Sequence, residues 1–276
     1  MVPAALFSQT TQPAPPTQPT QPTQPSQPSG PAGAAPAEPA LVFAGAQSAV
    51  GNGLNLPAGV AVDRAGDVFI TDTNNNRVVE LPANGSAQIT VVSGLNAPNG
   101  IAVDAAGDLF VADTGNFRVL MIPAGGGTQS IVGSGFGAPV GVAVDGAGDV
   151  FVTDALHDLV VKVSPGGSQT KAGSGLRFPT GVAVDAAGDV FIADYANNRV
   201  LEVPAGGGSQ TTVGKGLYQP FGVSVDGTGD VFIADSGDNR IVKVAAADGT
   251  QTTVSSGTHD PTGVAIDRTG NVFIAD

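Results

Sequence analysis

The sequence predicts an all-β fold, a six-bladed β-propeller that follows a disordered tail. The segment GVAVDAAGDVFIADYANNRV, residues 181–200, recurs along the chain in six near-copies. The copies follow one another every 40 or 41 residues, which is the length of a propeller blade. No copy has helical periodicity, so each is expected to form antiparallel strands. The copies begin near Gly59, Gly100, Gly141, Gly181, Gly222 and Gly263.

Each copy divides into four short strands, here called a to d in chain order. In residues 181–214, GVAVD is strand a, VFIAD is strand b, RVLEV is strand c and the segment around QTTV is strand d. The D-x-x-G-D motif is a tight turn between a and b. Because antiparallel strands alternate in direction, the d–a and b–c loops lie on one face of the ring. We call this side the loop face.

The two ends of the chain are expected to complete the sixth blade together. The last copy stops at NVFIAD, after two strands. At the other end, QSAVGNGLNLPAG (47–59) aligns with QTTVGKGLYQPFG (210–222), which predicts an outermost strand at 47–51. Leu41–Phe43 then falls where a third strand would lie. The sequence therefore assigns 41–276 to the propeller, with a fragment that lacks its C-terminal half-blade as the alternative.

The segment before the propeller is a low-complexity tract. Residues 8–40 hold repeated Pro, Thr and Gln and a single charge, Glu38. Such a tract buries too little apolar surface to offset the entropy of ordering, so 1–40 is predicted to be a disordered linker or stalk. Proline at every third position favours extended polyproline II structure. A ligand for Pro-recognition modules is the alternative interpretation.

The amino-acid composition argues against nucleic acid as a partner and against a membrane-spanning segment. The chain has 24 acidic and 11 basic residues, and its formal net charge of −13 disfavours nucleic acid. It has no cysteine, and no stretch approaches the length of a membrane span. Its start also lacks the pattern of a signal peptide. We also expect a monomer that does not insert directly into a membrane and that needs no cofactor or metal.

The residues that recur in the copies are predicted to be scaffold. One phenylalanine per copy is expected to pack each sheet on its neighbour, and an aspartate at the end of strand a is expected to cap its turn. A second aspartate and a later arginine bracket the b–c loop, which predicts an ion pair in four copies. The phenylalanines are Phe69, Phe110, Phe151, Phe191, Phe232 and Phe273, and the predicted pairs are Asp72–Arg77, Asp113–Arg118, Asp194–Arg199 and Asp235–Arg240.

Function is sought where the copies differ, and most aromatic differences fall on the loop face. Aromatic and arginine side chains on surface loops are typical anchors of interfaces. We therefore predict a site that binds a protein, a peptide or a cell-wall glycan. The alternative is that each ring only covers its own loop. The candidate binding residues are Phe117, Arg177, Phe178, Tyr195, Tyr218, Gln219 and Phe221.

The two histidines are weak catalytic candidates. His157 lies in the third copy, which reads Ala-Leu-His-Asp-Leu and lacks the bracing arginine, so Asp154 is expected to lack that partner. His259 lies in the sixth copy, on the opposite side of the ring. A catalytic zinc site usually needs three protein ligands, so two distant histidines do not predict one. A single histidine acting as a general base remains the enzymatic alternative.

The motif P-x-G-V-A-V-D-x-x-G-D-V-F-I-A-D-x-x-N-N-R-V resembles the NHL repeat family over residues 47–276. Within that family the chain is most similar to the extracytoplasmic sensor propellers of bacterial transmembrane Ser/Thr kinases. This resemblance implies a sensor domain of a bacterial protein at the cell surface. Kinase activity is not implied, because the nucleotide loop and the H-R-D and D-F-G motifs are absent.

Enzymes of related architecture give the alternative function. Streptogramin lyases have a similar architecture and use a histidine base, although their Trp-containing repeat signature is absent here. We therefore expect a non-enzymatic recognition propeller that acts as a sensor or scaffold. The alternative is a lyase or lactonase-like enzyme that uses a histidine on the rim.

Overall fold

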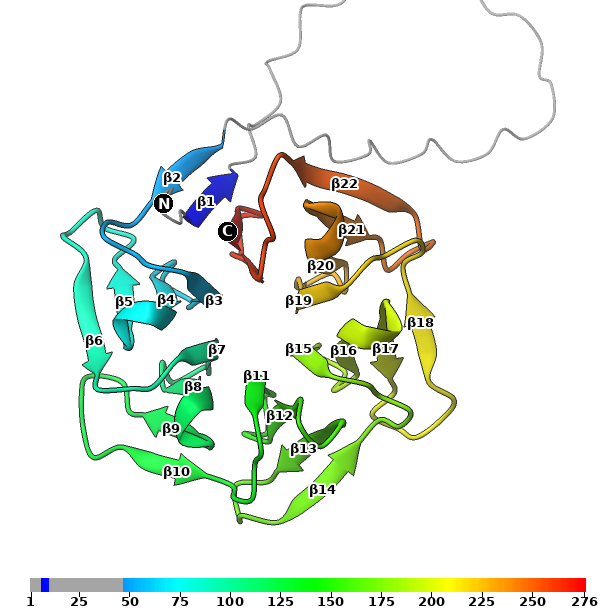
Figure 1. Ribbon diagram of the computed structural model, residues 1–276, viewed down its shortest axis with the longest axis horizontal. Coiled ribbons are helices and arrows are strands. Elements are labelled where there is room, and N and C mark those ends of the chain that lie inside the picture. The colour runs from blue at the N-terminus through cyan, green and yellow to red at the C-terminus, as the bar shows by residue number, and fades with distance from the viewer. Residues whose placement is uncertain (1–5, 10–46) are drawn as a thin grey trace, which may run out of the picture.

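The computed structural model describes residues 6–9 and 47–276, which form six four-stranded antiparallel sheets (Figure 1). Five of these sheets are blades, each built from one continuous segment, with strand a innermost. Blade 1 comprises β3 (Pro57–Val62), β4 (Val68–Asp72), β5 (Arg77–Leu81) and β6 (Ile89–Ser93). Blade 2 comprises β7 (Pro98–Val103), β8 (Leu109–Asp113), β9 (Arg118–Ile122) and β10 (Ser130–Val132). Short 3-10 turns join strands b and c: η1 (Thr73–Asn75), η2 (Thr114–Asn116), η3 (Tyr195–Asn197) and η4 (Ser236–Asp238).

The other three continuous blades repeat the same order. Blade 3 comprises β11 (Pro139–Val144), β12 (Val150–Asp154), β13 (Leu159–Val163) and β14 (Gln169–Ala172). Blade 4 comprises β15 (Pro179–Val184), β16 (Val190–Asp194), β17 (Arg199–Val203) and β18 (Thr211–Val213). Blade 5 comprises β19 (Pro220–Val225), β20 (Val231–Asp235), β21 (Arg240–Val244) and β22 (Gln251–Ser256). The prediction of an all-β propeller is therefore confirmed.

The remaining sheet draws its strands from both ends of the chain, and we call it the mixed sheet. Its order is β2 (Ser48–Val50), β1 (Leu6–Gln9), β24 (Val272–Ala275) and β23 (Gly263–Ile266). Strand β1 pairs with β24 on one side and with β2 on the other, so that Leu6 lies opposite both Ala275 and Val50.

The place of β1 corrects two expectations. Leu6–Gln9 lies within the span 1–40 that was predicted to be disordered, and it occupies the position that was assigned to Leu41–Phe43. Without a strand between them, β24 and β2 would each have an edge of unpaired backbone N–H and C=O groups. Any short strand close enough to both edges can pair with them. Leu41–Phe43 and the tract 10–40 lie outside the described residues.

The core lies between neighbouring sheets. Strand b is buried along its whole length in each continuous blade, because the sheets on either side cover both of its faces. Strand d is mostly exposed at the outer edge. All six recurring phenylalanines are buried, with at most 9% of their surface exposed, as predicted for core residues. Each such burial stabilises the fold by about 1.5–3 kcal/mol.

The a–b turns have the predicted geometry. Asp185 Oδ1 accepts the backbone N–H groups of Ala187 and Asp189, both at 2.9 Å. Gly188 has a φ of 89°, in the left-handed region that favours glycine. The other five a–b turns have the same carboxylate cap. The recurring aspartates and glycines at these turns therefore serve the backbone.

Candidate binding surface on the loop face

A buried carboxylate at the end of strand b organises the loop face of four blades. These aspartates are fully buried, and each lies 2.6 or 2.7 Å from the guanidinium of an arginine that begins strand c. The arginines are about one third exposed or less. All four predicted ion pairs are thus present, and they link strands b and c at the base of each loop.

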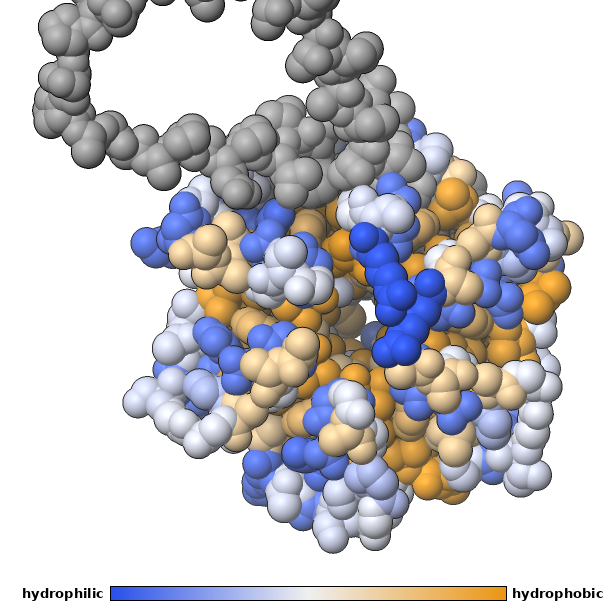
Figure 2. Space-filling model, turned by 180° about the vertical axis from the view of Figure 1, so that it is seen from behind, coloured by the Kyte–Doolittle hydropathy of each residue, from blue (hydrophilic) through white to orange (hydrophobic). Residues whose placement is uncertain are grey.

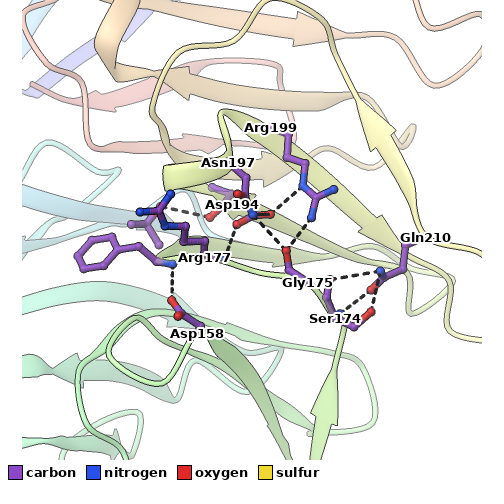
Figure 3. Close-up of polar contacts among 11 residues, drawn as sticks. Asp158, Ser174, Gly175, Arg177, Asp194, Asn197, Arg199 and Gln210 are labelled. Atoms are coloured by element: carbon purple, nitrogen blue, oxygen red, sulfur yellow. Dashed lines mark hydrogen bonds and ion pairs between the residues drawn. The ribbon is translucent and has the colours of Figure 1, made fainter.

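The Asp194 site shows how one carboxylate connects two loops (Figure 3). Arg199 Nε and Asn197 Nδ2 donate to Asp194 Oδ2 at 2.7 and 2.8 Å. The backbone N–H of Arg177, in the d–a loop, donates to Oδ1 at 2.7 Å. Arg199 also donates to the carbonyl of Gly175, in the same d–a loop, at 2.9 Å. The d–a and b–c loops of blade 4 are therefore held in one fixed arrangement.

Three of the predicted binding residues form an aromatic cluster on this base. The centroids of the Phe178 and Tyr195 rings lie 5.8 Å apart, and those of Tyr195 and Phe221 lie 6.1 Å apart in an edge-to-face arrangement. Phe178 precedes blade 4, Tyr195 begins η3, and Phe221 lies on β19 of blade 5. The three rings thus span the boundary between blades 4 and 5, in a geometry that aromatic pairs prefer.

The loop that carries Phe178 is fixed by the preceding blade. Phe178 has a φ of 51°, unusual for a residue with a bulky side chain. Its backbone N–H donates to Asp158 Oδ1 of blade 3 at 2.7 Å (Figure 3). Gln219 has the same backbone conformation and donates to Asn198 Oδ1 at 2.9 Å. The Phe178 side chain is about half exposed in this arrangement, with a relative exposure of 47%.

Tyr218 extends the surface beside the cluster. Its ring lies against Gly237, where any side chain would collide with it. Even so, 49% of Tyr218 is exposed.

Burial, and then the charges of Asp260 and Tyr218, raise the pKa of Tyr195, so its phenol is protonated at neutral pH. Arg177 and Gln219 flank these rings in the two d–a loops, Arg177 exposed and Gln219 half-buried. The surface therefore combines apolar rings, a hydroxyl donor and a guanidinium.

Phe117 lies apart from this surface. It is 61% exposed and directly follows η2 of blade 2, so blade 3 separates it from the cluster. No ring contact joins it to another aromatic side chain in the described part of the chain. It has a φ of 56°, at a position where asparagine or aspartate stands in blades 1, 3, 4 and 5. In the structure the predicted binding residues therefore fall into one group of six and one isolated ring.

Blade 3 lacks the arginine partner of Asp154, as expected, but it supplies a different partner that was not predicted from the sequence. Leu159 takes the place of the arginine, but His157 Nδ1 lies 2.8 Å from Asp154 Oδ2. His157 occupies the position of Asn75, Asn116 and Asn197, whose amides donate to the aspartate three residues earlier. The sequence contained this signal, because the Asp-x-x-Asn spacing recurs with histidine in place of asparagine.

The environment of Asp154 keeps it ionised. Burial alone would raise the pKa of Asp154, but the N–H groups of Gly137 and Ala138 and the contact with His157 outweigh it and lower that pKa. Asp154 is 1% exposed, whereas half of the His157 side chain is exposed. Asp154 thus contacts Nδ1 of an imidazole that is half exposed, an arrangement that could orient a histidine side chain.

His259 has no such arrangement. Its backbone N–H, not its ring, donates to Asp276, whose pKa is raised, chiefly by burial. His157 and His259 lie in blade 3 and in the loop before β23, on opposite sides of the ring (Figure 1). Across residues 6–9 and 47–276, no three His, Cys, Asp or Glu side chains are grouped to hold a metal ion. The two histidines therefore do not share a site.

Comparison with protein families identifies the repeat. Three segments of the chain match the NHL repeat: residues 54–81, 95–120 and 176–202. In blade 1, blade 2 and blade 4 they run from the d–a loop into strand c. The chain is therefore an all-β propeller that carries NHL repeats. No curated protein sequence matches it significantly.

Solved structures with the same fold include both enzymes and a binding protein. A nidogen/laminin complex matches with a TM-score of 0.69 and 21% identity, covering 83% of this chain and 89% of that one. Virginiamycin B lyase from Staphylococcus aureus matches with a TM-score of 0.63 and 12% identity, covering 83% and 84%. A streptogramin B lyase matches with a TM-score of 0.60 and 15% identity, covering 80% and 90%. At these identities the similarity establishes the fold alone.

Proposed function

We propose that the chain is a recognition propeller that binds a protein, peptide or glycan ligand on its loop face. The observation that carries this proposal is the aromatic cluster of Phe178, Tyr195 and Phe221, with Arg177 and Tyr218 beside it. Rings of this kind on a fixed base lose little entropy on binding and act as anchors. The protein-binding propeller in the nidogen/laminin complex supports the class of function, though not the ligand.

The proposal includes the architecture that presents this face. The mixed sheet closes the ring as a sixth blade, since β23 packs against both β19 and β3. Gly263 also meets Ala58 of blade 1 in the way that the glycine of every other strand a meets the next blade. The protein acts as a monomeric sensor or scaffold at a bacterial cell surface. No helix among the described residues is long and apolar enough to cross a membrane.

The recognition function is tested by selection followed by mutation. The purified chain is screened against a displayed peptide library and against purified cell-wall glycan, and the resulting binder is titrated by calorimetry. The double variant Phe178→Ala/Tyr218→Ala is expected to weaken binding at least about tenfold, which equals about 1.4 kcal/mol. Both side chains are half exposed, so the melting temperature should change little.

Phe117→Ala is the matched control, because it removes an exposed ring from the same face outside the cluster. It should leave the affinity unchanged. Equal affinities of the double variant and the wild type would refute the assignment of this surface. Failure of both screens to yield a saturable ligand would refute the recognition function itself.

A second candidate is an enzyme of the lyase or lactonase type that uses His157 as its base. The specific observation in its favour is the contact between His157 and buried Asp154. Opening of a streptogramin B lactone, followed by chromatography, tests it directly. Turnover that is lost in His157→Ala and retained in His259→Ala would establish the enzyme, and absence of turnover by the wild type would exclude this substrate class.

A further inference from the structure

Two a–b turns, on the face opposite the loop face, carry an arginine that no other copy has. Arg64 in blade 1 and Arg268 in the mixed sheet follow the capping aspartate of their turns. The same position holds only small residues elsewhere, namely Ala105, Gly146, Ala186 and Gly227. The two arginines are 204 positions apart in sequence, but their turns are adjacent because β23 packs beside β3.

These turns border a crevice between blade 1 and the mixed sheet. Both arginines line a cavity of about 430 Å³, whose walls include Val68, Leu81 and Phe273. They also line a second hollow of about 250 Å³, together with Asp104 and Asp145. Figure 2, which views the molecule from behind, shows a strongly hydrophilic patch beside the central opening on this side. The crevice thus has an apolar interior and charged groups at its mouth.

The crevice carries two guanidinium groups that the corresponding turns of the other copies do not have. Within the described residues, no hydrogen bond or ion pair engages the guanidinium groups of Arg64 and Arg268, whereas four other arginines are paired with buried aspartates. Asn271 stands where every other copy has an aspartate, so the turn of Arg268 has lost one negative charge. These two changes both make this crevice less acidic than its counterparts, in a chain of net charge −13.

The acidic groups that face the arginines are engaged in the turns themselves. Asp63 Oδ1 accepts the N–H groups of Ala65 and Asp67, at 2.8 and 2.9 Å. Asp267 Oδ1 accepts the N–H groups of Thr269 and Asn271, both at 2.8 Å. These carboxylates therefore cap the backbone, and among the described residues none of them forms an ion pair with Arg64 or Arg268.

We infer that this crevice binds an organic carboxylate with an apolar body. Guanidinium groups form paired, charge-assisted hydrogen bonds with carboxylates, and two of them at one mouth fix the orientation of the ligand. The apolar part of the ligand then enters between Val68, Leu81 and Phe273, where it leaves water. This site is independent of the loop face and of the function proposed for it.

Benzoate is the probe that tests this inference. Titration into the full chain, followed by amide chemical shifts, should give saturable binding with a Kd of about 1 mM or tighter. Shifts should concentrate at residues 63–68, 81–83 and 267–273. Benzyl alcohol, which has the same ring without the charge, should bind at least about tenfold more weakly, a difference of about 1.4 kcal/mol.

Charge-removing variants show whether the arginines are responsible. Arg64→Gln and Arg268→Gln should each weaken benzoate binding, and the double variant should abolish saturation. Lys171→Gln is the matched control, because it removes one exposed positive charge from the outer strand of blade 3. It should bind benzoate as the wild type does.

Three outcomes would overturn the inference. They are the absence of saturable benzoate binding, an unchanged Kd in the double arginine variant, and an equal loss in Lys171→Gln. The loop-face variant Phe178→Ala/Tyr218→Ala should bind benzoate normally, so failure of the recognition function and failure of this site are distinguishable.

Discussion

Thr258 shows how a single position departs from the repeat at a cost in stability. It lies in the d–a loop before β23, where the other copies have Leu54, Leu95, Phe136, Leu176 and Leu217. It is 3% exposed, and its hydroxyl has no hydrogen-bond partner among the described residues. A buried hydroxyl without a partner costs about 1–3 kcal/mol. The fold is therefore less stable with Thr258 than it would be with the apolar residue that the other copies have at this position.

Thr258→Val should raise the free energy of unfolding by about 1 kcal/mol, because it removes the unpaired hydroxyl and keeps the shape of the side chain. Urea denaturation measures the change. Thr262→Val is the control with the opposite sign, since the Thr262 hydroxyl donates to the carbonyl of Ala58 at 3.1 Å. A loss of stability in Thr258→Val would contradict the argument.

Prediction from sequence worked best for residues whose role is repeated. The Asp–Arg pairs were predictable because four copies share one spacing, and each copy supports the interpretation of the others. The contact between Asp154 and His157 was missed because it occurs once. Spacing predicts five rings on the loop face, but it does not show which of them touch or that a blade separates Phe117 from the cluster.

At the scale of the strand, the glycine of strand a decides how closely neighbouring blades approach. A side chain at Gly141 would collide with the backbone carbonyl of Thr180 in blade 4. Each of the other five strands a has a glycine in the same relation to the next one around the ring. These positions therefore require glycine because of close packing, and not because of a left-handed backbone.

Gly141→Ala should destabilise the protein by about 2 kcal/mol or more, because well-packed backbone cannot easily move to admit a methyl group. Thermal unfolding measures the effect. Gly146→Ala in the a–b turn of the same blade is the matched control, since nothing lies within 4 Å of the added methyl group. Equal melting temperatures of the two variants would show that the blades can separate.

Strand order within the continuous blades followed from the alternating pattern and the turn motifs of the sequence. The strand at Leu6–Gln9 could not be predicted in this way, because a segment of four residues has too little pattern to be distinguished from other short apolar segments. Pairing with β24 and β2 is a long-range property, and the sequence offers two candidates for the same slot. Only the fold decides between them.

At the scale of the whole molecule, β1 joins the two ends of the chain. A chain that lacks residues 1–9 should melt at least about 5 °C below a chain that lacks only residues 1–5, because the first deletion removes the strand between β24 and β2. The two truncated chains differ only in residues 6–9, so the difference in their melting temperatures reports the contribution of β1. Differential scanning calorimetry measures both temperatures. Equal melting temperatures would show that the mixed sheet does not depend on this strand.

The mixed sheet also constrains the order of events during synthesis on the ribosome. Strand β1 emerges before every other described strand, and β24, its partner, emerges after all of them. The five continuous blades can form one after another as each segment leaves the exit tunnel. Until β24 arrives, the edge of β1 stays without its final neighbour, so the nascent protein depends on whatever protects that edge in the meantime.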